Sequence, residues 1–383
     1  MPLFIISMKV IIDDKIPFIN GVLEPFADVV YMSGGKISNK DLKDIDALII
    51  RTRTQCNATL LEGTKVKFIA SATIGHDHID KEYCESHNIF WTSAPGCNAT
   101  SVMQYVASAL LFYARERNIN LNERVMGVIG VGNVGRKIVK LAEILGLQVF
   151  LNDPPRAEKE GPCGYISIDG IIREADIVTF HVPLNRGSKY NTYHLAGEGI
   201  LNRLNKGTLF INTSRGEVMD SDILKREIAE NRISDAILDV WENEPDIDIS
   251  LLDMAFIGTP HIAGYSADGK ANGTKMVIRQ FSRFFRLDVL DDWEPEEIPT
   301  PDNILIHCNG YRKSFQEIVT EVVLKTYNIK DENRWLRNDI SRFEDYRGNY
   351  PLRREFHAYT LNAENIDLQS LHKLKLLGFK IKD

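Results

Sequence analysis

The chain has 383 residues, of which 44% are apolar and 26% are charged. This length and composition predict two or three globular domains and exclude a disordered chain, a collagen and a disulfide-rich mini-protein. The formal net charge of −7 argues against nucleic acid or an anionic membrane as a partner, because both would repel an acidic surface. An anionic substrate must therefore meet arginine or lysine side chains that are placed locally.

The cysteines and the apolar runs bear on location and on metal binding. Five cysteines are scattered along the chain without a CxxC pair, which favours reduced thiols in a cytoplasmic protein and disfavours a zinc site. No apolar run approaches the roughly 20 residues of a membrane span, and the first residues lack the basic region of a secretory signal. His76 and His78 resemble a metal pair, but no further ligands cluster with them, so we expect no metal.

Short β-branched runs alternate with helical patterns along most of the chain, which predicts an α/β fold with parallel sheets. The first block contains five candidate strands, at Lys9–Asp13, Val29–Met32, Ala47–Ile50, Lys67–Ala72 and Phe90–Thr92, with helices expected between most of them. A longer helix is expected over Ala99–Arg117. Six more candidate strands follow, at Val125–Ile129, Gln148–Asn152, Ile177–Phe180, Thr208–Asn212, Asp235–Leu238 and Phe256–Gly258. Six strands fit a complete doubly wound sheet, so the first block is a separate, smaller lobe.

The C-terminal part of the sequence is expected to form a third unit. The acid- and proline-rich segment Asp291–Pro301 is predicted to be a linker. Beyond it we expect strands at Ile304–Cys308, Phe356–Leu361 and Phe379–Ile381, and helices at Phe315–Tyr327 and Asn365–Leu377. That order suggests a small α+β domain, for which a ferredoxin-like sandwich is one possible arrangement.

A glycine motif marks a candidate dinucleotide site. The sequence Gly130-Val-Gly132-Asn-Val-Gly135 follows a predicted strand and opens a helix. Gly130 would permit the tight turn, Gly132 would leave room for a pyrophosphate at the helix N-terminus, and Gly135 would let the helix approach the strand. Asp153 ends the next strand, near the expected position of the ribose-binding acid, and favours NAD over NADP because it repels a 2′-phosphate. Two alternatives stay open: a glycine turn without a ligand, and a 2′-phosphate held by Arg156.

Three polar residues follow predicted strands of the second sheet, where such a sheet displays its functional side chains. Arg215 lies in Asn-Thr-Ser-Arg-Gly, Glu244 in Trp-Glu-Asn-Glu-Pro, and His261 in Thr-Pro-His-Ile-Ala-Gly. A 2-hydroxy acid that loses a hydride needs a base for its hydroxyl proton and a cation for its carboxylate. His261 suits the base, Glu244 could stabilise the imidazolium, and Arg215 offers a guanidinium fork. Each residue taken alone is more often structural, and their shared edge favours catalysis. His181, at another strand end, is expected to line the cofactor crevice rather than react.

These motifs resemble the D-isomer-specific 2-hydroxyacid dehydrogenases. The resemblance covers about residues 8 to 286, through the glycine motif, Ser-Arg-Gly at 214–216, Glu244-Pro245 and Pro-His-Ile-Ala-Gly at 260–264. A narrower resemblance, to members that act on a phosphorylated acid, rests on Ala94–Ala99, Asp153–Ala157 and His261–Thr274. It extends to Asn349-Tyr350 and Arg353–Phe356 in the tail.

The resemblance implies a domain plan and a set of site residues. Residues 1–100 plus 264–287 would form a flavodoxin-like substrate lobe, 101–263 a Rossmann NAD domain, and 288–383 a dimerisation domain of a homodimer. Arg215 and Glu244 would be catalytic, and His261 would donate or accept the proton. The implied NAD-contact positions are Gly130, Gly132, Asn133, Val134, Gly135, Asp153, His181, Val182, Thr213, Ser214, Asp239 and Gly264. The implied substrate contacts are Thr52, Thr73 and Tyr265. Val182 and His76 stand where threonine is usual in the narrower group.

The expected substrate is a small phosphorylated 2-hydroxy acid. Arg51 and Arg53, in Arg-Thr-Arg-Thr after a predicted strand, offer two guanidinium groups and neighbouring hydroxyls for its phosphate. The alternative is a solvated basic loop, in which case Arg353 and Arg354 are the next candidates. Two other functions stay open: phosphoglycerate dehydrogenase, which shares the chemistry, and an NAD-sensing binding protein of the co-repressor type, which the same family contains.

Overall fold

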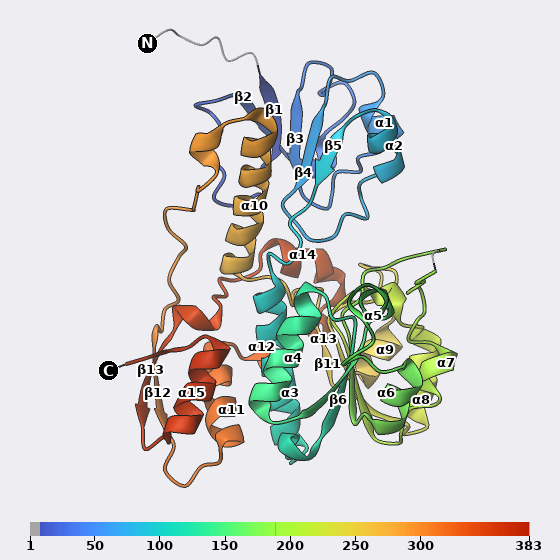
Figure 1. Ribbon diagram of the computed structural model, residues 1–383, viewed down its shortest axis with the longest axis vertical. Coiled ribbons are helices and arrows are strands. Elements are labelled where there is room, and N and C mark those ends of the chain that lie inside the picture. Colours follow the sequence, from blue (N-terminus) through green and yellow to red (C-terminus); the bar gives the residue numbers. More distant parts are fainter. Residues whose placement is uncertain (1–7, 188, 383) are drawn as a thin grey trace. The chain divides into compact units, whose positions relative to one another are not determined.

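Three parallel sheets organise the part of the chain that the computed structural model describes, residues 8–187 and 189–382 (Figure 1). The chain divides into two compact units. Unit 1 contains residues up to Asn98 together with Ser266–Pro299, and unit 2 contains Ala99–Tyr265 together with Thr300–Asp383. The C-terminal segment is thus grouped with the dinucleotide-type sheet, and the three-domain division with its boundaries stays a prediction.

Unit 1 is built on a five-stranded parallel sheet in the order β2-β1-β3-β4-β5, which is the flavodoxin-like order. Its strands are β1 (Lys9–Asp13), β2 (Asp28–Met32), β3 (Ala47–Ile50), β4 (Phe68–Ser71) and β5 (Phe90–Thr92). The helix α10 (Ala267–Phe285) packs on one face, where Phe281 meets Phe68. The predicted strands are confirmed, but the only α-helices between them are two short ones, α1 (Ala58–Leu61) and α2 (Lys81–Ser86).

Unit 2 contains a six-stranded parallel sheet in the order β11-β10-β9-β8-β6-β7. Its strands are β6 (Val125–Ile129), β7 (Gln148–Asn152), β8 (Ile177–Phe180), β9 (Thr208–Asn212), β10 (Ile233–Leu238) and β11 (Ile257–Gly258). A doubly wound sheet has a further strand beyond β7, and here a single parallel bridge between Leu151 and Tyr165 takes that place. All six predicted strands are therefore confirmed, and the strand order reverses between β6 and β8.

Helices cover both faces of this sheet. The long α3 (Ala99–Glu116) and α4 (Asn133–Leu145) pack together on one face. The other face is covered by α6 (Ile168–Glu174), α7 (Glu198–Leu201), α8 (Ser221–Ala229) and α9 (Ile249–Met254), while α5 (Pro154–Glu160) follows β7. Because apolar residues are buried on both faces, the strands are nearly continuous apolar runs in the sequence, and their positions could be predicted from it.

Helix α3 is buried almost all round because the C-terminal segment covers its outer side. The helix α11 (Phe315–Thr326) shares a hydrophobic cluster with it. Three polar side chains of α3 are fully buried, and each bonds to that segment. Ser101 Oγ donates to Glu355 Oε1 at 2.9 Å, Gln104 Nε2 to the Arg354 carbonyl at 2.8 Å, and Ser108 Oγ to the Tyr327 carbonyl at 2.7 Å. Because buried polar groups need hydrogen-bond partners, these three side chains of α3 depend on the C-terminal segment to satisfy them.

The C-terminal segment forms a small sheet of three parallel strands. These are β12 (Leu305–Asn309), β13 (Thr360–Glu364) and β14 (Lys380–Ile381), with α15 (Leu368–Leu377) between the last two. Between β12 and β13 lie α11, α12 (Ile329–Glu332), α13 (Trp335–Asn338) and α14 (Phe343–Gly348). The ferredoxin-like possibility is wrong, because strands joined by crossover helices are all parallel here. No helix in the described part of the chain combines the length and apolarity of a membrane span.

Candidate active site

The glycine motif lies in the turn between β6 and α4, as the sequence predicts. Gly130 has a φ of +86°, and a Cβ there would come within 2.8 Å of the His181 carbonyl. At Gly135 a Cβ would lie 2.0 Å from the Gly130 carbonyl oxygen, so only glycine lets the helix approach the turn. At Gly132, the N-cap of α4, a Cβ would meet nothing within 4 Å. The first N–H groups of a helix have no partner within it, so the open space at Gly132 fits a dinucleotide pyrophosphate.

Asp153 caps the next helix and braces the glycine loop. Its Oδ2 accepts the Val131 N–H at 2.8 Å and its Oδ1 the Arg156 N–H at 3.1 Å. Arg156 forms two hydrogen bonds to the Glu160 carboxylate, at 2.9 and 2.7 Å, and another to the Val131 carbonyl. The charge of Arg156 is therefore compensated by a neighbouring acid, which removes the main argument for a 2′-phosphate and favours NAD.

His181 and Val182 follow β8, on the other side of β6 from β7. The imidazole bonds to Thr179 Oγ1 at 2.8 Å and to Thr213 Oγ1 at 3.4 Å. Burial lowers the pKa of His181 to about 3, so the ring is neutral near pH 7 and is a poor proton acceptor. The structure thus places His181, Val182 and Thr213 around the strand-order reversal, where a dinucleotide binds in such sheets.

Arg215 lies in a loop after β9 that Asn212 organises. The buried Asn212 accepts hydrogen bonds from Ser214 N and Oγ, at 3.0 and 2.8 Å, and donates to the Arg215 carbonyl at 2.9 Å. The next residue, Gly216, packs directly on another backbone segment, since a Cβ there would lie 1.9 Å from the Trp241 carbonyl. Glycine at 216 therefore brings the Arg215 loop against the loop that carries Glu244.

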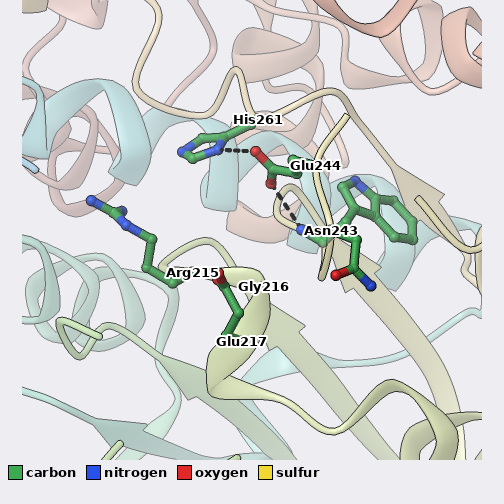
Figure 2. Close-up of a pocket in the computed structure, with 7 residues that line it drawn as sticks. Arg215, Gly216, Glu217, Asn243, Glu244 and His261 are labelled. Carbon is green, nitrogen blue, oxygen red and sulfur yellow. Dashed lines mark hydrogen bonds and ion pairs between the residues drawn. The ribbon is translucent and has the colours of Figure 1, made fainter. Parts of the chain in front are cut away.

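Glu244 and His261 form a hydrogen-bonded pair. Glu244 Oε2 lies 2.7 Å from His261 Nδ1, and Glu244 Oε1 accepts the Trp241 N–H at 2.9 Å (Figure 2). Burial by itself raises the pKa of Glu244, but the charge and hydrogen bond of His261, with the Trp241 N–H, bring that pKa below its ordinary value. An ionised carboxylate only accepts hydrogen bonds, so Nδ1 carries a proton and Nε2 is left as the acceptor.

His261 itself has a left-handed backbone, with a φ of +55°, which costs a non-glycine residue about 1–2 kcal/mol. The buried carboxylate of Asp239 holds the loop in this conformation. It accepts the N–H groups of Ile262 and Ala263, both at 2.8 Å, and the Thr259 hydroxyl at 2.7 Å. Burial raises the pKa of Asp239 to about 6, against the lowering effects of His261 and these donors. Asp239 is thus above all a support for the His261 loop, and its predicted contact with NAD stays a prediction.

The predicted catalytic residues line one cleft of about 240 Å³ within unit 2 (Figure 2). Its walls are Arg215, Gly216, Glu217, Trp241, Asn243, Glu244 and His261. A guanidinium, a proton acceptor and a carboxylate that stabilises the protonated acceptor therefore face one space. This set can bind a carboxylate, remove a hydroxyl proton and stabilise the resulting charge.

The expected substrate residues are distributed over both units. In unit 1, Thr52 is exposed after β3 and Thr73 follows the adjacent strand β4, with its hydroxyl 2.8 Å from Ser71 Oγ. Arg53 is exposed and Arg51 half-buried, but the neighbouring Thr54 is buried and donates to the Gly34 carbonyl at 3.0 Å. Thr54 is thus unsuited to the hydroxyl role suggested for it.

In unit 2, Tyr265 lies beside Tyr350, with 5.6 Å between their ring centroids. Gly264 precedes it in the turn after the His261 loop, and Asn133 and Val134 lie in the first turn of α4. Arg353 and Arg354, the alternative phosphate residues, are 4% and 8% exposed. Arg353 donates to the Ala263 carbonyl at 2.5 Å, so its guanidinium is engaged within the protein.

Comparisons with known proteins define the class. Residues 104–263 match the family described as the NAD binding domain of D-isomer specific 2-hydroxyacid dehydrogenases, and residues 298–378 match a domain of unknown function, DUF3410. The match to the crystal structure of Aquifex aeolicus D-lactate dehydrogenase with NAD and lactic acid covers 74% of this chain and 97% of the D-lactate dehydrogenase chain. Its TM-score is 0.63 at 24% identity. The match to NAD-bound 3-phosphoglycerate dehydrogenase of Entamoeba histolytica covers 76% of this chain and 100% of that chain, with a TM-score of 0.63 at 22% identity. The chain is an NAD-dependent dehydrogenase of the D-isomer-specific 2-hydroxyacid class.

Curated relatives narrow the class further, and they extend over the C-terminal segment. The erythronate-4-phosphate dehydrogenase of Bacteroides thetaiotaomicron is 50% identical over 92% of this chain and 99% of its own length. That of Proteus mirabilis is 36% identical over 97% of this chain and 99% of its own length. The chain therefore belongs to the erythronate-4-phosphate dehydrogenase family, and the narrower resemblance seen in the sequence is confirmed.

The second and third glycines of the motif allow a paired test. We expect Gly132→Ala to weaken NADH binding about tenfold or more with an unchanged Tm, because its Cβ meets only the space left for the pyrophosphate. Gly135→Ala should weaken NADH binding and also cost about 1–3 kcal/mol of stability, because its Cβ overlaps the Gly130 carbonyl.

Fluorescence titration with NADH and thermal unfolding would separate the two effects. Gly199→Ala in α7, where a Cβ meets nothing within 4 Å, is the matched control and should leave NADH affinity unchanged without lowering Tm, because alanine favours a helix over glycine. Wild-type NADH affinity in Gly132→Ala would mean that the pyrophosphate does not lie over this turn.

Proposed function

We propose that this protein oxidises 4-phospho-D-erythronate with NAD to (R)-3-hydroxy-2-oxo-4-phosphooxybutanoate, a step of pyridoxal 5′-phosphate biosynthesis. The observation that carries the proposal is the shared cleft of Arg215, Glu244 and His261 at the carboxyl edge of a dinucleotide-type sheet. The names of the relatives, at 36–50% identity over nearly the whole chain, supply the substrate.

The cleft assigns a task to each residue. His261 Nε2 accepts the proton of the substrate hydroxyl, since Nδ1 is bonded to Glu244. The Glu244 carboxylate stabilises the imidazolium that forms. The Arg215 guanidinium binds the substrate carboxylate and the oxygen on which negative charge develops. When bound, NAD supplies the acceptor for the hydride.

The two rival functions are weaker on different grounds. Phosphoglycerate dehydrogenase shares the cleft chemistry, but the solved example matches only 76% of this chain at 22% identity. An NAD-sensing binding protein has no need of a proton acceptor paired with a partly buried carboxylate, whereas here His261 Nδ1 and Glu244 Oε2 are 2.7 Å apart. The assembled acid–base pair therefore favours an enzyme.

A comparison of substrates tests the proposal. Steady-state rates of NADH formation should be much higher with 4-phospho-D-erythronate than with 3-phospho-D-glycerate. His261→Asn should lower kcat about 10²–10⁴-fold with NADH affinity retained, because a positioned base is removed. Asparagine adopts a left-handed backbone more readily than most residues, so this change removes the base without adding strain. A higher rate with 3-phospho-D-glycerate would overturn the substrate, and near-wild-type turnover of His261→Asn would exclude His261 as the base.

The substrate phosphate needs a local cation because the chain is acidic as a whole. We propose that Arg51 and Arg53 provide it, with Thr52 and Thr73 as further contacts. Arg51 Nη1 bonds only weakly to the Lys15 carbonyl, at 3.3 Å, and Arg53 and Thr52 are exposed. Thr52 and Thr73 follow neighbouring parallel strands, so they stand at the same edge of the unit 1 sheet as the arginines.

Alanine at either arginine tests this phosphate site. At least one of Arg51→Ala and Arg53→Ala should raise KM for 4-phospho-D-erythronate about 10- to 150-fold, the value of a hydrogen bond to a charged group. Kd for NADH should not change, because the glycine loop belongs to unit 2. Unphosphorylated D-erythronate is the control, and its KM should be unaffected. A change below about twofold in both variants would place the phosphate elsewhere.

We propose further that the protein is a homodimer formed through its C-terminal sheet. Residues of β12 alternate strictly: Ile306 and Cys308 are buried, while Leu305, His307 and Asn309 are exposed. A parallel sheet is normally covered on both faces, but the open face of β12 presents the apolar Leu305, which is 40% exposed, beside His307 and Asn309. A second copy of the chain is the proposed cover.

A charge on the open face should disrupt such a dimer. We expect Leu305→Asp to shift the protein toward half its mass in light scattering, because an unpaired carboxylate would be buried between two copies. Val289→Asp, at an apolar position in unit 1 that is 73% exposed, is the control and should leave the mass unchanged. A monomeric wild type, or a Leu305→Asp variant of unchanged dimeric mass, would contradict the proposed interface.

We also propose a cytoplasmic location. The five cysteines are all free thiols, and Cys163 is exposed, which suits a reducing compartment.

A further inference from the structure

The strand that leads to His261 is held at its outer edge by the C-terminal segment. β11 is the edge strand of the unit 2 sheet, so one side of its backbone has no neighbouring strand. Asn333, just after α12, bonds to that side. Its Oδ1 accepts the Gly258 N–H at 2.9 Å and its Nδ2 donates to the Phe256 carbonyl at 3.1 Å. One side chain thus replaces a strand three residues before the catalytic histidine.

A second contact from the same segment lies two residues after the histidine. Arg353 is 4% exposed, and its Nη2 donates to the Ala263 carbonyl at 2.5 Å. Its Nη1 lies 3.3 Å from the Tyr350 hydroxyl, and the guanidinium stacks 4.6 Å from the Tyr327 ring centroid. The hydroxyls of Tyr327 and Tyr350 both donate to the buried Glu332 carboxylate. An arginine so enclosed has a fixed position, so the carbonyl it binds is fixed as well.

Two buried charged side chains therefore form hydrogen bonds with the backbone of Ala263. The Asp239 carboxylate accepts its N–H at 2.8 Å, and the Arg353 guanidinium binds its carbonyl. The left-handed His261 lies between Ala263 and Gly258, whose N–H bonds to Asn333. A strained backbone persists only where its surroundings over-determine it. With Asn333 before it and Arg353 after it, the strain at His261 is held by contacts that the dinucleotide-type sheet alone does not supply.

We propose that Asn333 and Arg353 are positioning residues for catalysis: the C-terminal segment holds His261 in the orientation that pairs it with Glu244. The proposal rests on the proposed function in that His261 is the base. It gives the C-terminal segment a role inside its own subunit, besides any contact with a second copy.

Two variants and one matched control test the proposal. Arg353→Lys keeps the charge but loses the guanidinium geometry, and Asn333→Ala removes both bonds to β11. The control is Gln316→Ala. Gln316 also ties the C-terminal segment to the rest of unit 2 by two bonds, donating to the Ile119 carbonyl and accepting the Leu121 N–H, both at 2.8 Å. These bonds lie before β6, away from the His261 loop, so the control loses a similar tie without touching the site.

The expected result is a loss of turnover that does not follow stability. kcat should fall about 10- to 150-fold in Arg353→Lys and about 2- to 12-fold in Asn333→Ala, the range for lost charged and neutral hydrogen bonds. Kd for NADH should stay within twofold of wild type in both. Gln316→Ala should lower Tm with an unchanged kcat. If kcat falls in proportion to Tm in all three variants, the contacts only stabilise the fold and the proposal is overturned.

A spectroscopic readout separates this proposal from the proposed function. The proton between His261 and Glu244 should give a downfield NMR resonance in the wild type, assigned by its loss in His261→Asn. It should weaken or shift in Arg353→Lys and Asn333→Ala but not in Gln316→Ala. An unchanged resonance in both variants would overturn the positioning role. This measurement needs no substrate, so inactivity on 4-phospho-D-erythronate would count against the proposed function alone.

Discussion

The buried carboxylate of Asp239 is the constraint on which the geometry of the candidate active site depends. It is 1% exposed, and its two oxygens accept three hydrogen bonds from the loop that carries His261. A carboxylate taken out of water is costly unless its lone pairs are satisfied, so this loop cannot shift without leaving that charge unpaired. Thr259 transmits the same constraint further, because its hydroxyl also meets Tyr105 on α3 at 2.6 Å and its carbonyl accepts the Trp241 indole N–H at 2.9 Å.

Most of the fold could be predicted because a buried parallel strand can be recognised from its own short stretch of sequence. Ala47–Ile50 and Thr208–Asn212 are buried along their whole length and read as unbroken apolar runs. The segment between β1 and β2 was harder. Pro17, Pro25 and Gly21 break it into turns, so a connection that an α/β pattern assigns to a helix contains none. The ferredoxin-like arrangement suggested for the C-terminal sheet came from the order of its predicted strands and helices, and that order does not determine whether the strands run parallel, as they do.

The site could be predicted only where function follows a strand end. Arg215, Glu244 and His261 were placed in one cleft because the carboxyl ends of parallel strands share an edge. The residues that hold them were not found in the same way. Gly216 leaves no room for a Cβ beside the Trp241 backbone, and Asn333 and Arg353 bond to residues 75 and 90 positions away in the chain. No local sequence pattern encodes such distant pairs. Thr54, whose hydroxyl is predicted from the sequence to bind the substrate phosphate, instead donates to the Gly34 carbonyl within unit 1.

The separation between Ala263 and Arg353 also has a consequence for biosynthesis. The two residues that form this bond are 90 positions apart, and the arginine is made last. At about 5–20 residues per second, a ribosome needs roughly 5–18 s to synthesise the intervening chain. During that interval every strand of the dinucleotide-type sheet already exists, while the carbonyl of Ala263 lacks its cationic partner. The strands of this sheet are therefore all synthesised before the arginine that we propose to position the His261 loop, so translation separates the formation of the sheet from the formation of this contact.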